Sequence, residues 1–190
     1  MLFSKVLERT GVGNHIHQLS DELFRQGHRV IVVSGTNKQG IGGENVDFEG
    51  MQTTSRNIFV VLKNIRKLHN IIVRNNIDVV HCHHRVAALY IKLHNIIYTK
   101  IPVVYTLHLA PVPSDFLHRA FTFPGDCAIG VASETSDFLI QGLKVPKEKV
   151  VTVLNGVDKK QLRELSLQEK AAVFRKCIVK KLLCCVAAKK

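Results

Sequence analysis

The sequence has no tryptophan, few aromatic residues and no long hydrophobic run, and each absence narrows the class of protein. Aromatic residues make up 6% of the 190 residues. Surfaces that bind nucleic acid often interleave basic residues with aromatic rings, so this scarcity disfavours a nucleic-acid-binding protein. No apolar run approaches the roughly 18 residues of a membrane span. Met1 is not followed by the basic and apolar segments of a signal peptide, so we expect a soluble, cytoplasmic protein.

Cysteine is present in a pattern that excludes two common structural uses. The sequence has five cysteines, an odd number, with no C-x-x-C spacing and with two of them adjacent. They are Cys82, Cys127, Cys177, Cys184 and Cys185. This pattern indicates neither a disulfide framework nor a zinc ribbon, and we expect reduced thiols that act as small hydrophobic residues.

Acidic residues are scarce in two blocks of the chain, and these blocks account for the formal net charge of +12. Residues 50–110 contain 8 basic residues and 1 acidic residue, and residues 156–190 contain 10 and 3. The basic residues of the first block, on helix-like sequence, are Arg56, Lys63, Arg66, Lys67, Arg74, Arg85, Lys92 and Lys100. A solvated helix face, an anionic membrane surface and an acidic ligand all fit such a block, whereas DNA or RNA fits poorly.

What the sequence does contain is an alternation of short apolar runs with amphipathic stretches. The apolar runs are 2–3, 30–33, 79–80, 103–107, 127–132 and 150–154, and they are rich in β-branched residues. Such runs are typical of strands buried on both faces. Because crossovers of helix length require parallel pairing, we predict a doubly wound, mainly parallel Rossmann-like α/β sheet.

Helical spacing predicts the elements between these strands. We expect a first helix capped by Asn14 and ended by Gly27 in the left-handed conformation. Further helices are predicted over residues 58–72 and 87–97, and Ser133 is a candidate cap for a fourth. Residues 34–54, rich in glycine and asparagine, are predicted to form a long irregular connection that could close over a site.

A glycine pair stands where the first strand passes into the first helix. Gly11, Val12 and Gly13 either form a plain tight turn or leave the amides at the helix start free to hold an anion. NAD binding is disfavoured because Ile16 replaces the third glycine of the dinucleotide fingerprint and the second strand ends in Ser34 rather than an acidic residue.

Histidines follow two of the predicted strands. His81 and His83 would project to the same face of a strand and could share a zinc ion with a third ligand. Histidines at strand ends more often hydrogen-bond to loops or contact a polar substrate. For His81, His83 and the adjacent His84 we therefore favour a site without a metal ion. His108 ends the run 103–107, and structural and functional roles both remain open for it.

These pieces, in this order, resemble the N-terminal domain of family 4 glycosyltransferases, which have the GT-B fold of two Rossmann-like domains across a cleft. The resemblance covers about residues 2–158. Six segments carry it: residues 11–13, Leu19 and Leu23 with the turn Gly27-His28-Arg29-Val30, Asp78-Val79-Val80-His81-Cys82-His83, Pro102-Val103-Val104-Tyr105-Thr106-Leu107-His108, Ser133-Glu134 and Val153-Leu154-Asn155-Gly156-Val157-Asp158. The paired-glutamate motif of the family's nucleotide-binding second domain is absent from the sequence.

The resemblance implies a role for each segment. Gly11, Val12 and Gly13 would lie beside the acceptor and the sugar-nucleotide phosphates, and His108 would face the reacting sugar as the catalytic residue. The acceptor and donor side would include His81, His83, His84, Arg85, Ser133 and Glu134. Asn155, Gly156 and Asp158 would lead into the second domain, and no metal or other cofactor is expected.

Two functional readings follow from the resemblance. The first is a truncated retaining glycosyltransferase that moves a hexose from a nucleotide diphosphate sugar to a glycan or lipid-linked acceptor. In this reading residues 1–158 form the acceptor-side domain, and residues 159–190 begin an incomplete second domain or form a tail. The chain alone would be inactive, with a possible peripheral contact at the inner face of an anionic membrane. The second reading is a non-catalytic module that binds an acceptor or docks a partner carrying the missing domain.

Overall fold

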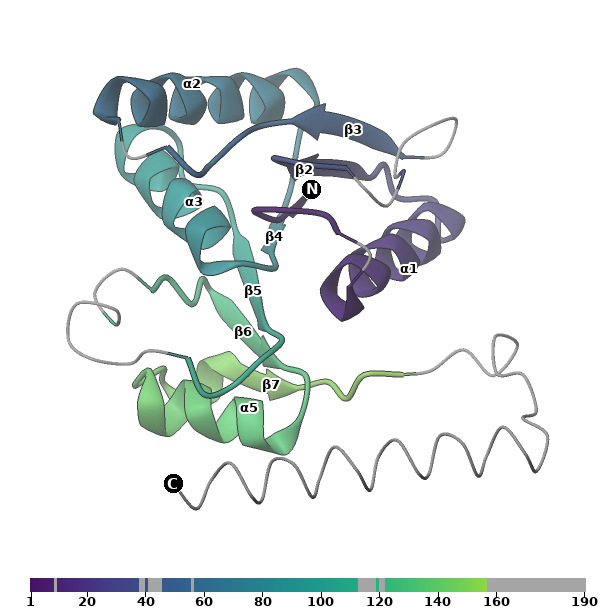
Figure 1. The fold of residues 1–190 in the computed structure, drawn as a ribbon, viewed down its shortest axis with the longest axis vertical. Helices are drawn as coiled ribbons and strands as arrows, with labels where there is room; N and C mark the ends of the chain where they lie inside the picture. Colours follow the sequence, from purple (N-terminus) through teal and green to yellow (C-terminus); the bar gives the residue numbers. More distant parts are fainter. Residues whose placement is uncertain are drawn as a thin grey trace, which may run out of the picture. The chain divides into compact units, whose positions relative to one another are not determined.

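Seven strands form one sheet in the order β3-β2-β1-β4-β5-β6-β7, and every neighbouring pair runs parallel (Figure 1). The computed structural model describes residues 1–8, 10–37, 40, 46–55, 57–112, 119 and 122–156. The strands are β1 (Leu2–Phe3), β2 (Ile31–Ser34), β3 (Asp47–Gly50), β4 (Val80–Cys82), β5 (Val103–Leu107), β6 (Cys127–Gly130) and β7 (Val150–Thr152). The predicted doubly wound parallel α/β fold is therefore confirmed.

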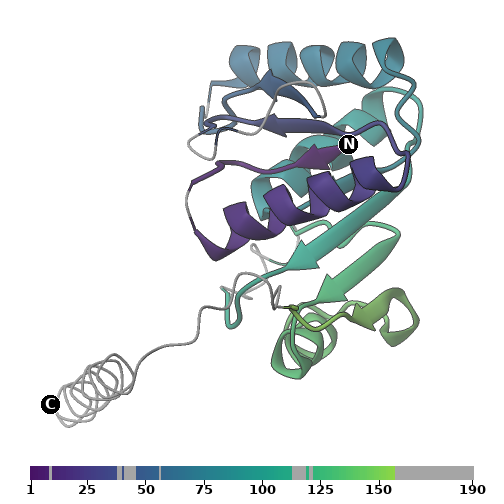
Figure 2. The same cartoon turned by 90° about the vertical axis from the view of Figure 1, so that its right-hand side faces the viewer.

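Helices cover both faces of this sheet (Figures 1 and 2). They are α1 (Gly11–Arg25), α2 (Ile58–Arg74), α3 (Arg85–Ile97) and α5 (Ser133–Asp137), followed by a π-helical turn η1 (Phe138–Gly142) and a 3₁₀ turn η2 (Lys147–Lys149). Within the described ranges, no helix combines the length and the hydrophobicity needed to cross a membrane.

Alternation along the strands divides the core into two parts. On one face, Leu2 and Val32 pack with Ile16 of α1. On the other face, Phe3 and Val33 belong to the larger core, which includes Ile65, Leu68, Ile71 and Ile72 of α2 and Ala87, Ala88, Tyr90 and Ile91 of α3. The sheet thus has an α1 face and an α2–α3 face, and this division decides where the strand histidines point.

The start of α1 corrects two predictions. The helix begins at Gly11 rather than after Asn14, and its N-cap is Thr10, whose Oγ1 accepts a hydrogen bond from Gly13 N at 3.3 Å. The glycine pair is therefore the first helical turn and not a turn before the helix. The capping hydroxyl of Thr10 stabilises a helix start that the two glycines would otherwise disfavour. The predicted helix end is confirmed, because Gly27 has φ +86°.

Strand β3 corrects the prediction of an irregular connection over residues 34–54. Residues 47–50 pair with β2 in the register Ile31↔Asp47 and Ser34↔Gly50. The strand lies at the edge of the sheet, and its residues are exposed or half-buried. A polar edge strand is held mainly by backbone hydrogen bonds, so its composition resembles that of a loop.

Other boundaries differ by a few residues from the predictions. The fourth helix begins at Ser133 itself, and Ala132 takes the cap position without a side-chain hydrogen bond to the helix, so the predicted Ser133 cap is wrong. Strands β6 and β7 end at Gly130 and Thr152, before the apolar runs end. Residues up to Asn155 form one compact unit. The predicted start of a second domain or tail at 159–190 lies outside the described residues, as does Asp158.

Candidate functional site

Strand register brings the histidines of β4 next to the end of β5 on the α1 face. His81 pairs with Leu2 on one side and with Val104 on the other. Because side chains alternate, His83 lies on the same face as His81, whereas Cys82 faces the α2–α3 core and is buried. The same alternation in β5 puts Thr106 and His108 on the α1 face, beside these histidines.

Two hydrogen bonds connect these side chains across the strands. His81 Nε2 lies 2.6 Å from Thr106 Oγ1, and His83 Nδ1 lies 3.1 Å from His108 Nε2. The second bond requires that one of the two nitrogens carries the proton and the other accepts it. The remaining nitrogen of His83, Nε2, is buried and has no partner among the described residues.

A third element adds His15 to the group. His15 lies in the second turn of α1, and its ring centroid is 4.9 Å from that of His108 and 5.6 Å from that of His83. One nitrogen from each of His15, His83 and His108 can be chosen so that all three lie within 4.8 Å of one another. We call these three residues the histidine triad. His15 was not among the sequence-predicted site residues.

Burial keeps the imidazoles of this region neutral. Desolvation, followed by the neighbouring charges of His15 and His108, lowers the pKa of His81 to about 4. Desolvation and then His15 lower the pKa of His108 to about 4. The pKa of His83 lies well below the ordinary value for the same reasons, and desolvation also lowers that of His15. At neutral pH the site therefore offers uncharged imidazoles that can donate and accept hydrogen bonds.

The first turn of α1 lies at the same edge of the sheet as the triad. Gly11 is exposed, Val12 is half-buried and Gly13 is buried, and all three precede His15 on one helix. Amides in the first turn of a helix lack intrahelical acceptors and favour anions. Because His15 of the next turn contacts His108, the Gly11 segment and His108 lie at the same, carboxyl edge of the sheet.

His84 and Arg85 take part in the start of α3. His84 Nδ1 accepts a hydrogen bond from Val86 N at 3.2 Å and caps the helix, of which Arg85 is the first residue. Desolvation first, and then the charges of Lys5 and Arg85, lower the pKa of His84. His84 is thus committed to a structural role, although it lies at the same edge as the triad.

The remaining predicted site residues follow β6 and β7. Ser133 and Glu134 are exposed at the start of α5, and Asn155 and Gly156 are exposed after β7. Asn155 N donates to Val131 O at 3.4 Å. In the described part of the chain, no hydrogen bond or ring contact joins these four residues to the histidine triad.

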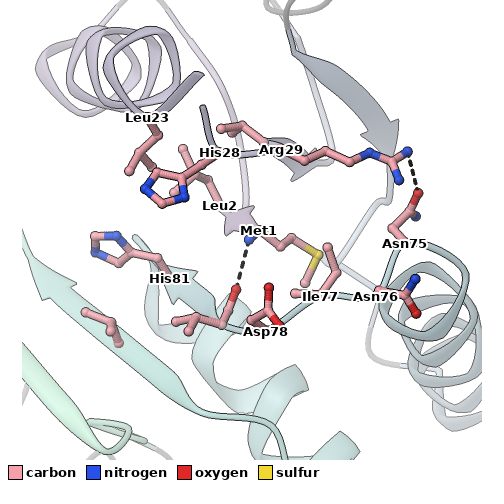
Figure 3. A pocket seen from close by; sticks show the side chains of 13 residues that line it. Met1, Leu2, Leu23, His28, Arg29, Asn75, Asn76, Ile77, Asp78 and His81 are labelled. Atoms are coloured by element: carbon pink, nitrogen blue, oxygen red, sulfur yellow. Dashed lines mark hydrogen bonds between the residues drawn. The ribbon is translucent and has the colours of Figure 1, made fainter. Parts of the chain in front are cut away.

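A cavity of about 490 Å³ lies at the opposite ends of the strands (Figure 3). Its lining includes residues that precede β1, β2 and β4, with Arg29 bonded to Asn75 Oδ1 at 3.0 Å on one side and His81 on the other. Ligands of parallel α/β sheets collect at the carboxyl ends, where helix N-termini point. We therefore place the candidate site at the triad and not in this cavity.

Comparisons with known proteins identify the fold and the family of the chain. A search of curated proteins gives no match. A glycosyltransferase from Rickettsia africae ESF-5 superposes with a TM-score of 0.65 at 21% identity, covering 94% of this chain and 49% of that one. HepE from Anabaena, solved in complex with UDP, gives a TM-score of 0.62 at 16% identity, and the match covers 94% of this chain and 49% of that one. The lipopolysaccharide outer core galactosyltransferase WaaB gives a TM-score of 0.63 at 11% identity, and the match covers 85% of this chain and 48% of that one.

This chain thus spans about half the length of these solved structures. The all-parallel seven-stranded sheet is the Rossmann-like half of their GT-B fold. The sequence profile of Glycosyltransferase Family 4 matches residues 9–161, which include the histidine triad and six of the seven strands. The chain therefore belongs to Glycosyltransferase Family 4, and its described residues form an N-terminal domain of that family.

Proposed function

We propose that this chain is the acceptor-side half of a retaining glycosyltransferase that moves a hexose from a nucleotide diphosphate sugar to a glycan or lipid-linked acceptor. The observation that carries the proposal is the meeting of His83, His108 and the first turn of α1 at one edge of the sheet. Structural neighbours give further support, because HepE was solved with UDP and with UDP and glucose, and WaaB is described as a galactosyltransferase.

His108 is the catalytic residue of this proposal. Because its pKa is lowered to about 4, His108 is neutral at pH 7 and hydrogen-bonds to a hydroxyl of the reacting sugar rather than supplying positive charge. His83 acts as a positioning residue, since its contact with Nε2 of His108 fixes the orientation of that ring and leaves Nδ1 for the substrate.

The first turn of α1 is assigned to the donor phosphates and the adjoining acceptor. Gly11 leaves room for an anionic group, because a Cβ at this position would have nothing within 4 Å. Helix amides and basic side chains would stabilise the leaving diphosphate, so transfer requires no metal ion. His81, Arg85, Ser133 and Glu134 extend the site along the same edge, and Asn155, Gly156 and Asp158 connect to a second domain.

A test of this assignment joins a family C-terminal domain after Asp158. We expect the isolated chain to transfer no sugar and the fusion to recover transfer. In the fusion, His108→Ala should lower kcat about 100-fold or more while donor affinity changes little. His17→Ala is the matched control, because His17 lies on α1 two residues from His15 but is half-exposed and pairs with Asp21.

The outcomes separate the proposal from its alternative. Transfer by the isolated chain at a normal enzymatic rate would contradict the two-domain argument. A fusion that is indifferent to His108→Ala would remove the catalytic assignment. If the fusion stays inactive and amide NMR signals of the isolated chain shift with an acceptor but not with nucleotide sugars, the chain is a non-catalytic acceptor-binding or partner-docking module.

We also propose that α2 makes a peripheral contact with an anionic membrane surface at the cytoplasmic side. Phe59 is 77% exposed and Leu62 is 48% exposed, and the exposed residues Lys63 and Arg66 continue the same helical stripe. Residues 58–74 contain no acidic side chain. Exposed apolar residues bordered by cations are typical of helices that bind at the interface of anionic lipids.

Vesicle sedimentation tests this membrane contact. We expect the chain to bind vesicles containing phosphatidylglycerol more strongly than vesicles of phosphatidylcholine alone, and high salt should weaken the binding. Phe59→Ser should reduce binding severalfold. Ile96→Ser is the matched control, because Ile96 is 70% exposed at the end of α3. Equal losses in both variants, or equal binding to both lipids, would contradict the contact.

A further inference from the structure

The histidine triad has the donor set of a transition-metal site. His15, His83 and His108 come from α1, from the residue after β4 and from the residue after β5, so three separate elements supply one imidazole each. Among the described residues, these three form a group whose ligating nitrogens lie within 4.8 Å of one another. Imidazole nitrogens favour Zn²⁺, Cu²⁺ and Ni²⁺, whereas Mg²⁺ and Ca²⁺ require oxygen ligands.

One pair of the triad has a spacing close to that of a tetrahedral site. With metal–nitrogen bonds of about 2.0–2.1 Å, two ligands of a tetrahedral zinc ion lie about 3.3 Å apart. His83 Nδ1 and His108 Nε2 are 3.1 Å apart, so a metal ion could bind both nitrogens once the proton between them has moved to the other nitrogen of its own ring. His15 is half-buried near the start of α1, and one of its nitrogens lies within 4.8 Å of the ligating nitrogens of the other two.

A second observation concerns the ring nitrogen of His83 that does not contact His108. His83 is 4% exposed, and its Nε2 atom has no partner within the described part of the chain. Buried polar atoms in native proteins are nearly always satisfied, so Nε2 points to a bound water molecule beside the cluster, whereas the ion would bind Nδ1. Neighbouring side chains do not fill this role, because His81 is bonded to Thr106 and His84 caps α3.

We propose that His15, His83 and His108 bind a divalent transition-metal ion of the zinc class, with one coordination position left open. The open position follows from the number of ligands, since three protein ligands leave the fourth corner of a tetrahedron to water or to an oxygen of a substrate. The ion is not required for the proposed transfer. It competes with the His83–His108 hydrogen bond, and the proposal stands whether or not the chain takes part in glycosyl transfer.

Cobalt titration of the full 190-residue chain tests the site. Co²⁺ gives intense visible d–d absorption in a tetrahedral site and only weak absorption in an octahedral one. We expect tetrahedral bands with one equivalent of Co²⁺, loss of these bands on adding Zn²⁺ and no loss on adding Mg²⁺. His15→Ala and His108→Ala should each weaken binding by about 100-fold or more.

The controls distinguish binding at the triad from binding of the ion by other side chains of the protein. His17→Ala, with the same substitution on the same helix, should bind Co²⁺ like the unmodified chain. The test does not depend on His83, whose burial makes its variants prone to misfold, because both tested histidines are partly exposed. Unchanged binding in both triad variants would overturn the proposal. So would thiolate-to-cobalt charge-transfer absorption, because it would place the ion on cysteines.

Discussion

At the scale of single residues, Gly130 is a position where the fold leaves no room for a larger side chain. It lies in β6 between Leu107 of β5 and Thr152 of β7, and a Cβ there would lie 2.6 Å from the backbone nitrogen of Ser136 in α5. We expect Gly130→Ala to lower the free energy of unfolding by about 3 kcal/mol, because backbone must move to accept the methyl group. Urea denaturation measures this loss.

A matched glycine provides the control for that measurement. Gly11 begins α1, and a Cβ at this position would have no neighbouring atom within 4 Å. Gly11→Ala should therefore leave stability unchanged or raise it by up to about 1 kcal/mol, because alanine restricts the unfolded chain. Similar losses in both variants would show that close approach to Ser136 is not the cause.

Much of the site could be predicted residue by residue, because strand alternation is a local rule. The rule places His81 and His83 together and sends Cys82 to the other face, as the structure does. His15 could not be found in this way. Its neighbour Ile16 is part of the apolar pattern of α1, and only the packing angle of that helix against the sheet decides that His15 reaches His108.

At the scale of elements, the cap of α1 determines where the site begins. Thr10 Oγ1 accepts from Gly13 N, and the helix that follows carries His15. Thr10→Ala should lower the free energy of unfolding by about 1 kcal/mol. Thr10→Asn should recover most of this loss, because asparagine is an equally good cap. Equal destabilisation by alanine and asparagine in urea denaturation would contradict the capping role.

Sequence patterns predicted the buried elements better than the edges and ends of elements. The run 103–107 coincides with β5, and the pattern 58–72 lies within α2, because both repeat buried apolar residues at the right period. Strand β3 was missed because its residues are only partly buried and its pairing with β2 is a property of the folded sheet. The cap at Thr10 was missed because two glycines indicate a loop more strongly than a helix.

At the scale of the whole molecule, the four neighbouring histidines make stability depend on pH. His15, His81, His83 and His108 face one another on the α1 side, and burial lowers the pKa of each in the folded state. In the unfolded chain they titrate near 6.5. Between this value and about 4, the folded-state pKa of His81 and His108, the unfolded chain binds more protons than the folded chain. Stability is therefore fully present above the unfolded pKa and falls as the pH is lowered.

We expect the free energy of unfolding to be level above pH 7 and to decline from about pH 6.5 toward pH 4. Urea denaturation measures it, in the presence of EDTA so that no metal ion is bound to the triad. His81→Gln isolates one titrating group, because glutamine can still bond to Thr106 but does not accept a proton in this range. Its slope should be shallower by up to about 1.4 kcal/mol per pH unit. Carboxylates contribute equally to both proteins, so the difference between the two curves belongs to His81. Parallel curves would mean that His81 titrates alike in the folded and unfolded chains, and that burial on the α1 face does not keep it neutral.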